Sequence, residues 1–381
     1  MRTALFITFL LLYFGAHFYL CRRIIQLLPA DHLWLRVIVI SGVVISALSM
    51  FIFFIWSERM SVSMASFFYT LGVSWLIVLL YLLLAFLLID VVKWVNLLFG
   101  FIDKELVYRL THANWKTLLA IFGTITLLLI YANYNFRNIQ RVHLTIETDK
   151  WCADTPPLRI VAISDVHLGY TKSVGELRKW IPLINGAKPD IVLIAGDFID
   201  NSIRPLDYFS LDEKLREIRA PMGVFAVLGN HEYIPGVRAS IDFMRRSNIT
   251  VLRDSVAIFD RFQIIGRDDY SQRNRKSIEN LTKNLDTSLF TILLDHQPFH
   301  LDDAIRGNVD FQFSGHTHRG QVWPITLIVN RMFELAYGYM KRDGTHFYVS
   351  SGLGIWGAKF RLGTQSEYVV IDVKPAQGIV E

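Results

Sequence analysis

The stretch IVAISDVH, residues 160–167, and the stretch IVLIAGD, residues 191–197, decide the fold of this 381-residue chain. Each begins with an apolar, β-branched run of the length and composition typical of a buried strand. The polar residues that follow therefore fall at the carboxyl end of a strand, where open sheets bind their ligands. Asp165 and His167 are two residues apart, so on an extended backbone they would point the same way and reach one cation together.

The same pattern recurs three times further along the chain, in VFAVLGNHE (224–232), FTILLDH (290–296) and FQFSGHTH (311–318). Taken singly, an Asp or Asn after a strand usually forms a turn, and a single His is more often a hydrogen-bonded residue than a ligand. Five such runs in succession instead predict a metal site at one edge of a sheet. Its candidate ligands are carboxylates, an amide and imidazoles: Asp165, His167, Asp197, Asn230, His296, His316 and His318.

The chemistry of these side chains narrows the choice of metal. Carboxylate, amide and imidazole ligands without a thiolate suit divalent ions such as Mn(II), Fe(II) or Zn(II). Seven ligands are too many for one tetrahedral ion, but two ions about 3.5 to 4 Å apart would use them all if one carboxylate bridges the pair. Such a pair activates water for attack on phosphorus. The sequence therefore predicts two divalent metal ions and a phosphorylated substrate.

These five motifs resemble those of the calcineurin-like metallophosphoesterase family, in its membrane-associated bacterial branch, over roughly residues 160–373. The resemblance implies an α/β fold in which two sheets pack face to face with helices outside, a four-layer α/β/β/α sandwich. By similarity, Asp197 would bridge the two ions. The resemblance assigns the remaining ligands to one ion each: Asp165, His167 and His318 to the first, and Asn230, His296 and His316 to the second.

His231 follows Asn230 directly and is not needed for coordination. The resemblance makes it the candidate catalytic residue, which would protonate the leaving oxygen or stabilise its charge. The alternative is that His231 only orients the loop that carries Asn230. Glu232 is either a hydrogen-bond acceptor behind the ligands or simply exposed, and we leave it out of the catalytic set.

The first third of the chain has a different composition. Four long apolar stretches, at about residues 3–20, 37–56, 66–89 and 118–134, each come close to the ~20 residues that cross a bilayer. We therefore predict a transmembrane region over 1–135 and a catalytic domain over 136–381. The first stretch has an alternative as a cleaved signal peptide, although no small-residue cleavage site precedes Cys21. The connection from Val91 to Lys116 is either an amphipathic helix or, as we prefer, an ordinary connecting loop.

Basic residues beside the apolar stretches predict the orientation in the membrane. Arg22, Arg23 and Arg36 flank the first connection, and the third carries four more basic residues: Lys93, Lys104, Arg109 and Lys116. The excess of positive charge favours a cytoplasmic position for both connections. We therefore expect a multi-pass protein of the cell membrane with an extracytoplasmic catalytic domain. The net charge of +5 suits a membrane surface and does not suggest nucleic acid binding.

One segment departs from the expected pattern. The run from Val322 to Tyr337 is rich in apolar residues and would be either ordinary core or an exposed lip that contacts an acyl chain or the bilayer. Arg361 is a possible phosphate contact. We predict a membrane-anchored hydrolase of a phosphate ester or pyrophosphate, acting on a lipid-linked substrate. The alternatives are a hydrolase of soluble phosphodiesters or nucleotides, with the helices only as anchor, and a non-catalytic membrane signalling protein.

Overall fold

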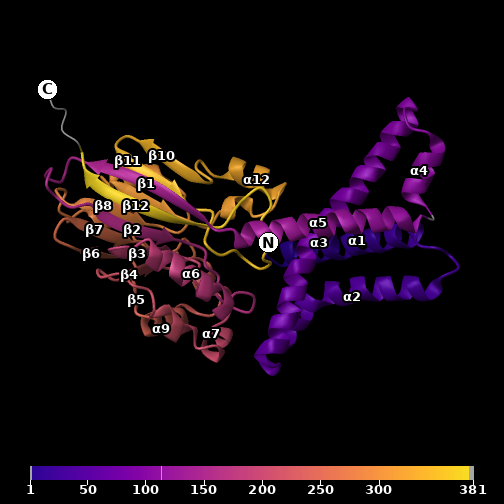
Figure 1. Cartoon of the computed structure of the whole chain (residues 1–381), viewed down its shortest axis with the longest axis horizontal. Helices are drawn as coiled ribbons and strands as arrows, with labels where there is room; N and C mark the ends of the chain where they lie inside the picture. Colours follow the sequence, from indigo (N-terminus) through magenta and orange to yellow (C-terminus); the bar gives the residue numbers. More distant parts are fainter. Residues whose placement is uncertain (1, 113, 377–381) are drawn as a thin grey trace. The chain divides into compact units, whose positions relative to one another are not determined.

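The computed structural model describes residues 2–112 and 114–376 (Figure 1). The chain divides into two compact units, Met1–Tyr131 and Ala132–Glu381. Among these described residues, the first unit is helical and the strands lie in the second.

The first unit is built from long apolar helices. It contains α1 (Arg2–Leu27), α2 (Leu33–Trp56), α3 (Val62–Phe99), α4 (Lys104–Thr111), the 3-10 turn η1 (Ser57–Arg59) and most of α5 (Trp115–Arg137). Within the described residues, three segments are long and apolar enough to cross a membrane: Leu33–Arg59, Val62–Phe99 and Trp115–Arg137. They contain the spans predicted at 37–56, 66–89 and 118–134. The span predicted at 3–20 lies in α1 and partly outside the described side chains, so it stays a prediction.

The prediction of an ordinary connecting loop between the third and fourth spans was wrong. Helix α3 continues to Phe99 and ends at Gly100, whose φ of 64° lies in the left-handed region that glycine adopts at helix ends. The short helix α4 then begins after Asp103, whose carboxylate accepts hydrogen bonds from the backbone N–H groups of Glu105 and Leu106. This N-cap makes helix favourable where the mixed composition had suggested a loop.

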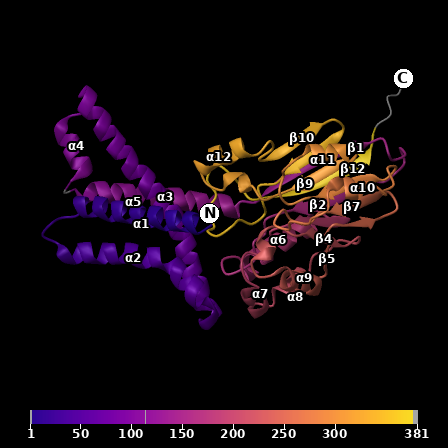
Figure 2. The ribbon, with the colours of Figure 1, turned by 180° about the vertical axis from the view of Figure 1, so that it is seen from behind.

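Two six-stranded sheets form the centre of the second unit (Figures 1 and 2). The first sheet has, in spatial order, β1 (Gln140–Thr148), β12 (Glu367–Pro375), β2 (Leu158–Ile163), β3 (Ile191–Ala195), β4 (Val224–Val227) and β5 (Ile249–Val251). The second has β10 (Gly338–Arg342), β11 (Thr345–Val349), β9 (Phe311–Ser314), β8 (Phe290–Leu294), β7 (Phe262–Gly266) and β6 (Ser255–Ile258). Strands β2 to β5 are mutually parallel, as are β7, β8 and β9.

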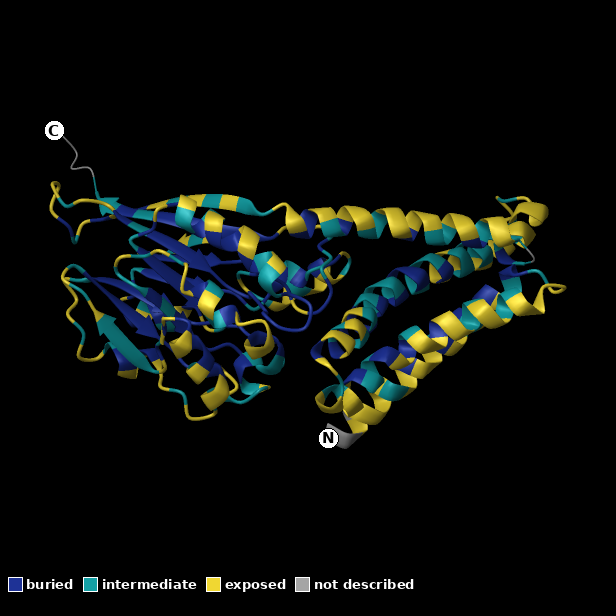
Figure 3. Cartoon of the chain, turned by 60° about the horizontal axis from the view of Figure 1, so that its bottom comes forward, coloured by how far each residue is buried: buried dark blue, intermediate teal, exposed yellow. Residues whose placement is uncertain are grey.

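The sheets pack face to face with helices outside, so the predicted four-layer sandwich is confirmed. One apolar cluster lies between the sheets and joins residues such as Ile160 and Leu193 of the first to Ile292 and Phe313 of the second. The outer face of the first sheet packs on α6 (Val174–Gly186) and α9 (Val237–Arg246), with α7 (Arg204–Tyr208) and α8 (Leu211–Leu215) nearby. The second sheet packs on α10 (Ile278–Thr282) and α11 (Asp302–Arg306). Figure 3 shows the central strands almost entirely buried.

Strand register brings the ends of the motif-bearing strands together. Ile163 of β2 pairs with Ile194 of β3, and Ala195 pairs with Val227 of β4. In the second sheet, Leu294 of β8 pairs with Phe313 of β9. Because these strands are parallel and end at matching heights, the turns that follow them share one edge of each sheet.

Candidate metal centre

The turns after these strands have strained backbone. Asp165, His167, Asp197, His316 and His318 all have φ between 48° and 69°, in the left-handed region that side chains other than glycine rarely adopt. The extended backbone predicted for Asp165 and His167 was therefore wrong. Each such residue costs of order 1–3 kcal/mol, and strain of this kind gathers at functional sites where the surrounding structure holds it in place.

Two glycines let these turns approach one another. A Cβ atom added to Gly229 would lie 2.2 Å from Oδ1 of Asp197, and one added to Gly315 would lie 2.3 Å from Oδ2 of Asp165. Both distances are far below contact distance, so a larger residue at either position would displace a carboxylate. This explains the glycine at the start of the polar motifs after β4 and β9.

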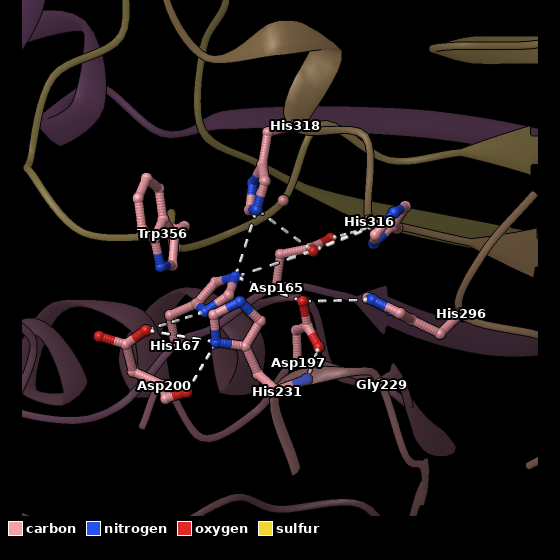
Figure 4. A network of polar contacts seen from close by, with 12 residues as sticks. Asp165, His167, Asp197, Asp200, Gly229, His231, His296, His316, His318 and Trp356 are labelled. Atoms are coloured by element: carbon pink, nitrogen blue, oxygen red, sulfur yellow. Dashed lines mark hydrogen bonds and ion pairs between the residues drawn. The ribbon is translucent and has the colours of Figure 1, made fainter. Parts of the chain in front are cut away.

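The side chains of Asp165, His167 and His318 meet at one point (Figure 4). Nε2 of His318 lies 3.6 Å from Oδ1 of Asp165, and Nε2 of His167 lies 3.9 Å from the same oxygen. The two Nε2 atoms are 3.2 Å apart. All three side chains are buried or nearly so. The three ligand atoms therefore surround a space of the size that one ion occupies.

A second group lies next to the first and consists of Asp197, His296 and His316. Oδ2 of Asp197 is 3.2 Å from Nε2 of His296 and 3.7 Å from Nε2 of His167, which belongs to the first group. One carboxylate therefore faces both groups. The Oδ1 atom of Asn230 is buried and has no hydrogen-bond partner among the described residues. All seven predicted ligand residues thus lie on turns at this one edge.

These groups fit divalent metal ions. Atoms that bind one ion at 2.0–2.2 Å lie about 3 to 3.5 Å from each other, close to the separations seen here. A buried amide oxygen without a donor, such as Oδ1 of Asn230, is costly in a protein interior unless something binds it. A cation does so, and the oxygen and nitrogen donors match Mn(II), Fe(II) and Zn(II).

Hydrogen bonds fix the direction of the imidazole of His296. Its Nδ1–H donates to the carbonyl oxygen of Ala195 at 2.7 Å, so Nε2 is the nitrogen that faces Asp197. A partner on the far nitrogen of this kind sets the tautomer and the orientation of metal-binding histidines. Burial lowers the pKa of His167 and of His316 to about 4, so both imidazoles are neutral near pH 7, the form that binds a metal.

Asp200, which was not among the residues predicted from the sequence, is fully buried beside His231 and His167. The Nδ1–H of His231 donates to the carbonyl oxygen of Asp200 at 2.6 Å, and Oδ1 of Asp200 lies 3.5 Å from Nδ1 of both histidines. Burial alone lowers the pKa of His231, but Asp200 and Asp197 raise it to about 9. The sequence offered one signal for Asp200. In the stretch GDFID, residues 196–200, Asp200 is a second acidic residue three positions after the predicted ligand Asp197.

Glu232, which we left out of the catalytic set, supports the ligand turns from behind. Its carboxylate accepts hydrogen bonds from the backbone N–H groups of Asp197, Ile199 and Gly229, at 3.0, 2.8 and 2.6 Å. It is fully buried, which excludes the expectation of simple exposure. One side chain therefore ties the turn after β3 to the turn after β4.

Arg361, suggested by the sequence as a possible phosphate contact, instead lies buried among loop carbonyls. Its side chain is fully buried, and its guanidinium donates to the carbonyl oxygens of Ser351, Gly352 and Gly354, at 2.6, 3.1 and 2.6 Å. It holds the loop after β11 together beneath Asp165.

Comparisons with known proteins agree with this geometry. Residues 158–320 match the family described as calcineurin-like phosphoesterase. The chain is 35% identical over 238 residues to an uncharacterized metallophosphoesterase of Aquifex aeolicus, covering 60% of this chain and 90% of that protein. It is 32% identical to a metallophosphoesterase of Campylobacter jejuni, covering 75% of this chain and 76% of that protein. A zebrafish (Danio rerio) transmembrane protein with a metallophosphoesterase domain is 29% identical, covering 68% of this chain and 63% of that protein.

Proposed function

Because the chain belongs to the calcineurin-like metallophosphoesterase family, we propose that it is a membrane-anchored phosphoesterase whose site holds two divalent metal ions. The family implies a metal-dependent hydrolase of phosphoesters. The observation that carries the dinuclear proposal is the position of Asp197, whose carboxylate lies within 3.2 Å of a nitrogen of one group and 3.7 Å of a nitrogen of the other. A bridging carboxylate needs this position.

Each ion would have its own set of ligands in addition to Asp197. The first would be held by Asp165, His167 and His318, and the second by Asn230, His296 and His316. When bound, two such ions activate water as a nucleophile and neutralise charge on the attacking and leaving oxygens of a phosphoryl group. The buried Oδ1 of Asn230 supports its place in the second set.

His231 would supply the proton for the leaving group. Since its Nδ1–H is held by the carbonyl oxygen of Asp200, its Nε2 is the atom free to donate toward substrate. A pKa raised by Asp200 and Asp197 keeps the imidazole protonated near neutral pH, as a general acid requires. Bound cations would lower that pKa again, toward the operating pH where proton transfer is most efficient. Asp200 is a positioning residue in this account.

For the substrate, we propose a phosphate ester or pyrophosphate linked to a lipid. Helix α12 (Ile325–Met332) starts shortly after the ligand His318 and exposes several apolar side chains, including Leu327 and Met332. The ring of Phe333, which ends this helix, stacks on Phe299 and lies 6.1 Å from the ring of the ligand His316. Acyl chains would find apolar surface beside the metals. The same aromatic pair would also stack a nucleobase, so soluble nucleotides are the alternative.

A substrate panel separates these two classes. The purified full-length chain, with added Mn(II), would be assayed on lipid phosphates of long and short chain with one headgroup, on nucleotides and on a small chromogenic phosphodiester. If acyl chains contribute binding energy in the transition state, each buried methylene is worth about 0.8 kcal/mol, so three or four should raise kcat/KM more than tenfold. Mixed micelles at constant surface concentration keep substrate presentation equal.

Phe333→Ser tests where the chain would bind. It should lose the chain-length preference while still cleaving the chromogenic diester, because Phe333 touches a ligand ring but is not a ligand. Equal rates for long and short chains in the unmodified protein, with faster cleavage of nucleotides, would support the soluble substrate instead.

We also propose that the catalytic unit lies outside the cytoplasm and that the chain crosses the membrane several times. The basic residues of the first and third connections support this orientation. A reporter active only outside the cytoplasm, fused after Glu381, should give signal, and one active only inside should be silent. The reverse pattern would invert the orientation and favour cytoplasmic nucleotides.

A further inference from the structure

Helix α12 carries an apolar face that the second unit leaves exposed. Leu327 and Ile328 are each 60% exposed and Met332 is 68% exposed, whereas Thr326 points inward and packs closely on Gly320. Trp323, just before the helix, is 50% exposed. Soluble surfaces seldom gather so many large apolar side chains within ten residues.

A neighbouring loop adds to this surface and is fixed to it by hydrogen bonds. The side chain of Gln321 donates to the carbonyl oxygens of Trp356 and Ala358, and the N–H of Trp323 donates to the carbonyl oxygen of Leu362. Trp356 is itself 41% exposed. We call the five exposed residues the apolar shelf: Trp323, Leu327, Ile328, Met332 and Trp356.

The loop that carries Trp356 is also bound to the end of helix α5. Within the second unit, the side chain of Asn133 donates to the carbonyl oxygen of Lys359 at 2.8 Å, and the N–H of Arg361 donates to the carbonyl oxygen of Ala132 at 2.9 Å. Asn135 donates to the carbonyl oxygen of Arg361. Residues 132–137 are the last turns of α5, a helix long and apolar enough to cross a membrane.

These bonds place the loop beside the membrane surface if α5 crosses the bilayer. Tyr131 and Tyr134, near the same helix end, are both exposed. In membrane proteins generally, exposed Tyr and Trp residues at helix ends anchor spanning helices at the lipid–water boundary. The headgroup layer is about 5 to 8 Å deep on each side of the hydrocarbon core, roughly the height of one helical turn. A loop fixed to the last turns of a spanning helix therefore lies in or next to that layer.

We propose that the apolar shelf inserts into the lipid bilayer, with α12 lying in the interface beside the metal centre. The helix is joined to the site at both ends, since it starts seven residues after His318 and its end residue Phe333 packs beside His316. A phosphate in the headgroup layer would then lie at the mouth of the site while its acyl chains stay in the bilayer. The inference rests on the proposed membrane anchoring and deepens the proposed lipid substrate.

A site-specific fluorescence measurement tests the insertion without requiring catalysis. In the full-length chain with Cys21→Ser and Cys152→Ser, the variants Leu327→Cys and Met332→Cys would each be labelled with an environment-sensitive nitrobenzoxadiazole probe. Ile258→Cys is the matched control, because Ile258 is also apolar and 68% exposed but lies on the edge strand β6. The labelled proteins would be placed in vesicles of phosphatidylcholine and phosphatidylglycerol, with or without doxyl-labelled lipid.

Insertion predicts blue-shifted emission at positions 327 and 332, and quenching by doxyl lipid several-fold stronger than at position 258. Emission typical of water at all three positions would overturn the proposal. A blue shift that doxyl lipid does not quench, but that weakens when the protein-to-lipid ratio is lowered, would mean that a second copy covers the shelf, and it would also overturn it. Because quenching does not depend on turnover, a failed hydrolysis assay would leave this result intact.

Discussion

Asp197→Asn is expected to abolish most hydrolytic activity and to lower the metal content of the protein. The asparagine keeps the shape of the side chain but removes the charge that faces both ligand groups, so each ion loses a ligand of opposite charge. Charge stabilisation by such ions is worth several kcal/mol in the transition state, and each 1.36 kcal/mol is tenfold. We expect a fall in kcat on the order of 1,000-fold.

Metal analysis of the purified variant, alongside the steady-state rate, checks this expectation. Asp242→Asn is the matched control, because Asp242 is half exposed on α9 and its ion pairs with Arg238 and Arg245 lie at the surface. It should retain both metal and activity. Two metals per chain and undiminished turnover in Asp197→Asn would contradict its assignment as the bridge.

His231→Ala is expected to behave differently, keeping its metals while its rate falls. Loss of a general acid typically costs 100 to 10,000-fold. In the unmodified protein the rate should decline as pH rises through the pKa of His231 in the metal-loaded site, because the proton to be donated is lost. That alkaline decline should be absent from the residual activity of His231→Ala.

Asp200→Asn separates positioning from proton donation. It keeps the backbone carbonyl that binds Nδ1 of His231 but removes the carboxylate that helps raise the pKa of that histidine. We expect a smaller fall in rate than for His231→Ala and a shift of the alkaline decline to lower pH. His143→Ala, at a half-exposed histidine on the edge strand β1, is the control.

For His231→Ala, loss of metal would contradict the role of His231 as proton donor. It would make His231 a ligand or a support for one.

The strands and the edge where ligands gather could be predicted because the signal is local. Apolar runs such as 191–195 are typical of buried strands. The polar residue after each run lies at the strand end, and this position follows from the local sequence alone. The local backbone of the turns could not be predicted in the same way. The positive φ values of Asp165 and His167 occur where turns from different strands lie close together, since a Cβ atom added to Gly315 would lie 2.3 Å from Oδ2 of Asp165.

Residues that act through others were harder to predict. Asp200 and Glu232 act on the site through other residues. The hydrogen bonds from His231 to Asp200 and from Asp197 to Glu232 join residues that are 31 and 35 positions apart in the sequence. Arg361 was misjudged because an arginine near a phosphate site suggests an anion, whereas one of its terminal nitrogens donates to three carbonyl oxygens of a folded loop. The exposure of α12 could not be read from its apolar sequence, which is equally typical of core.

The stoichiometry of metal activation tests the central claim most directly. The full-length chain would be stripped of metal with a chelator and then titrated with Mn(II) while hydrolysis of the chromogenic phosphodiester is followed. The account predicts no activity in the stripped protein and a rise that reaches its plateau at two equivalents per chain. A plateau at one equivalent, or full activity without metal, would contradict it.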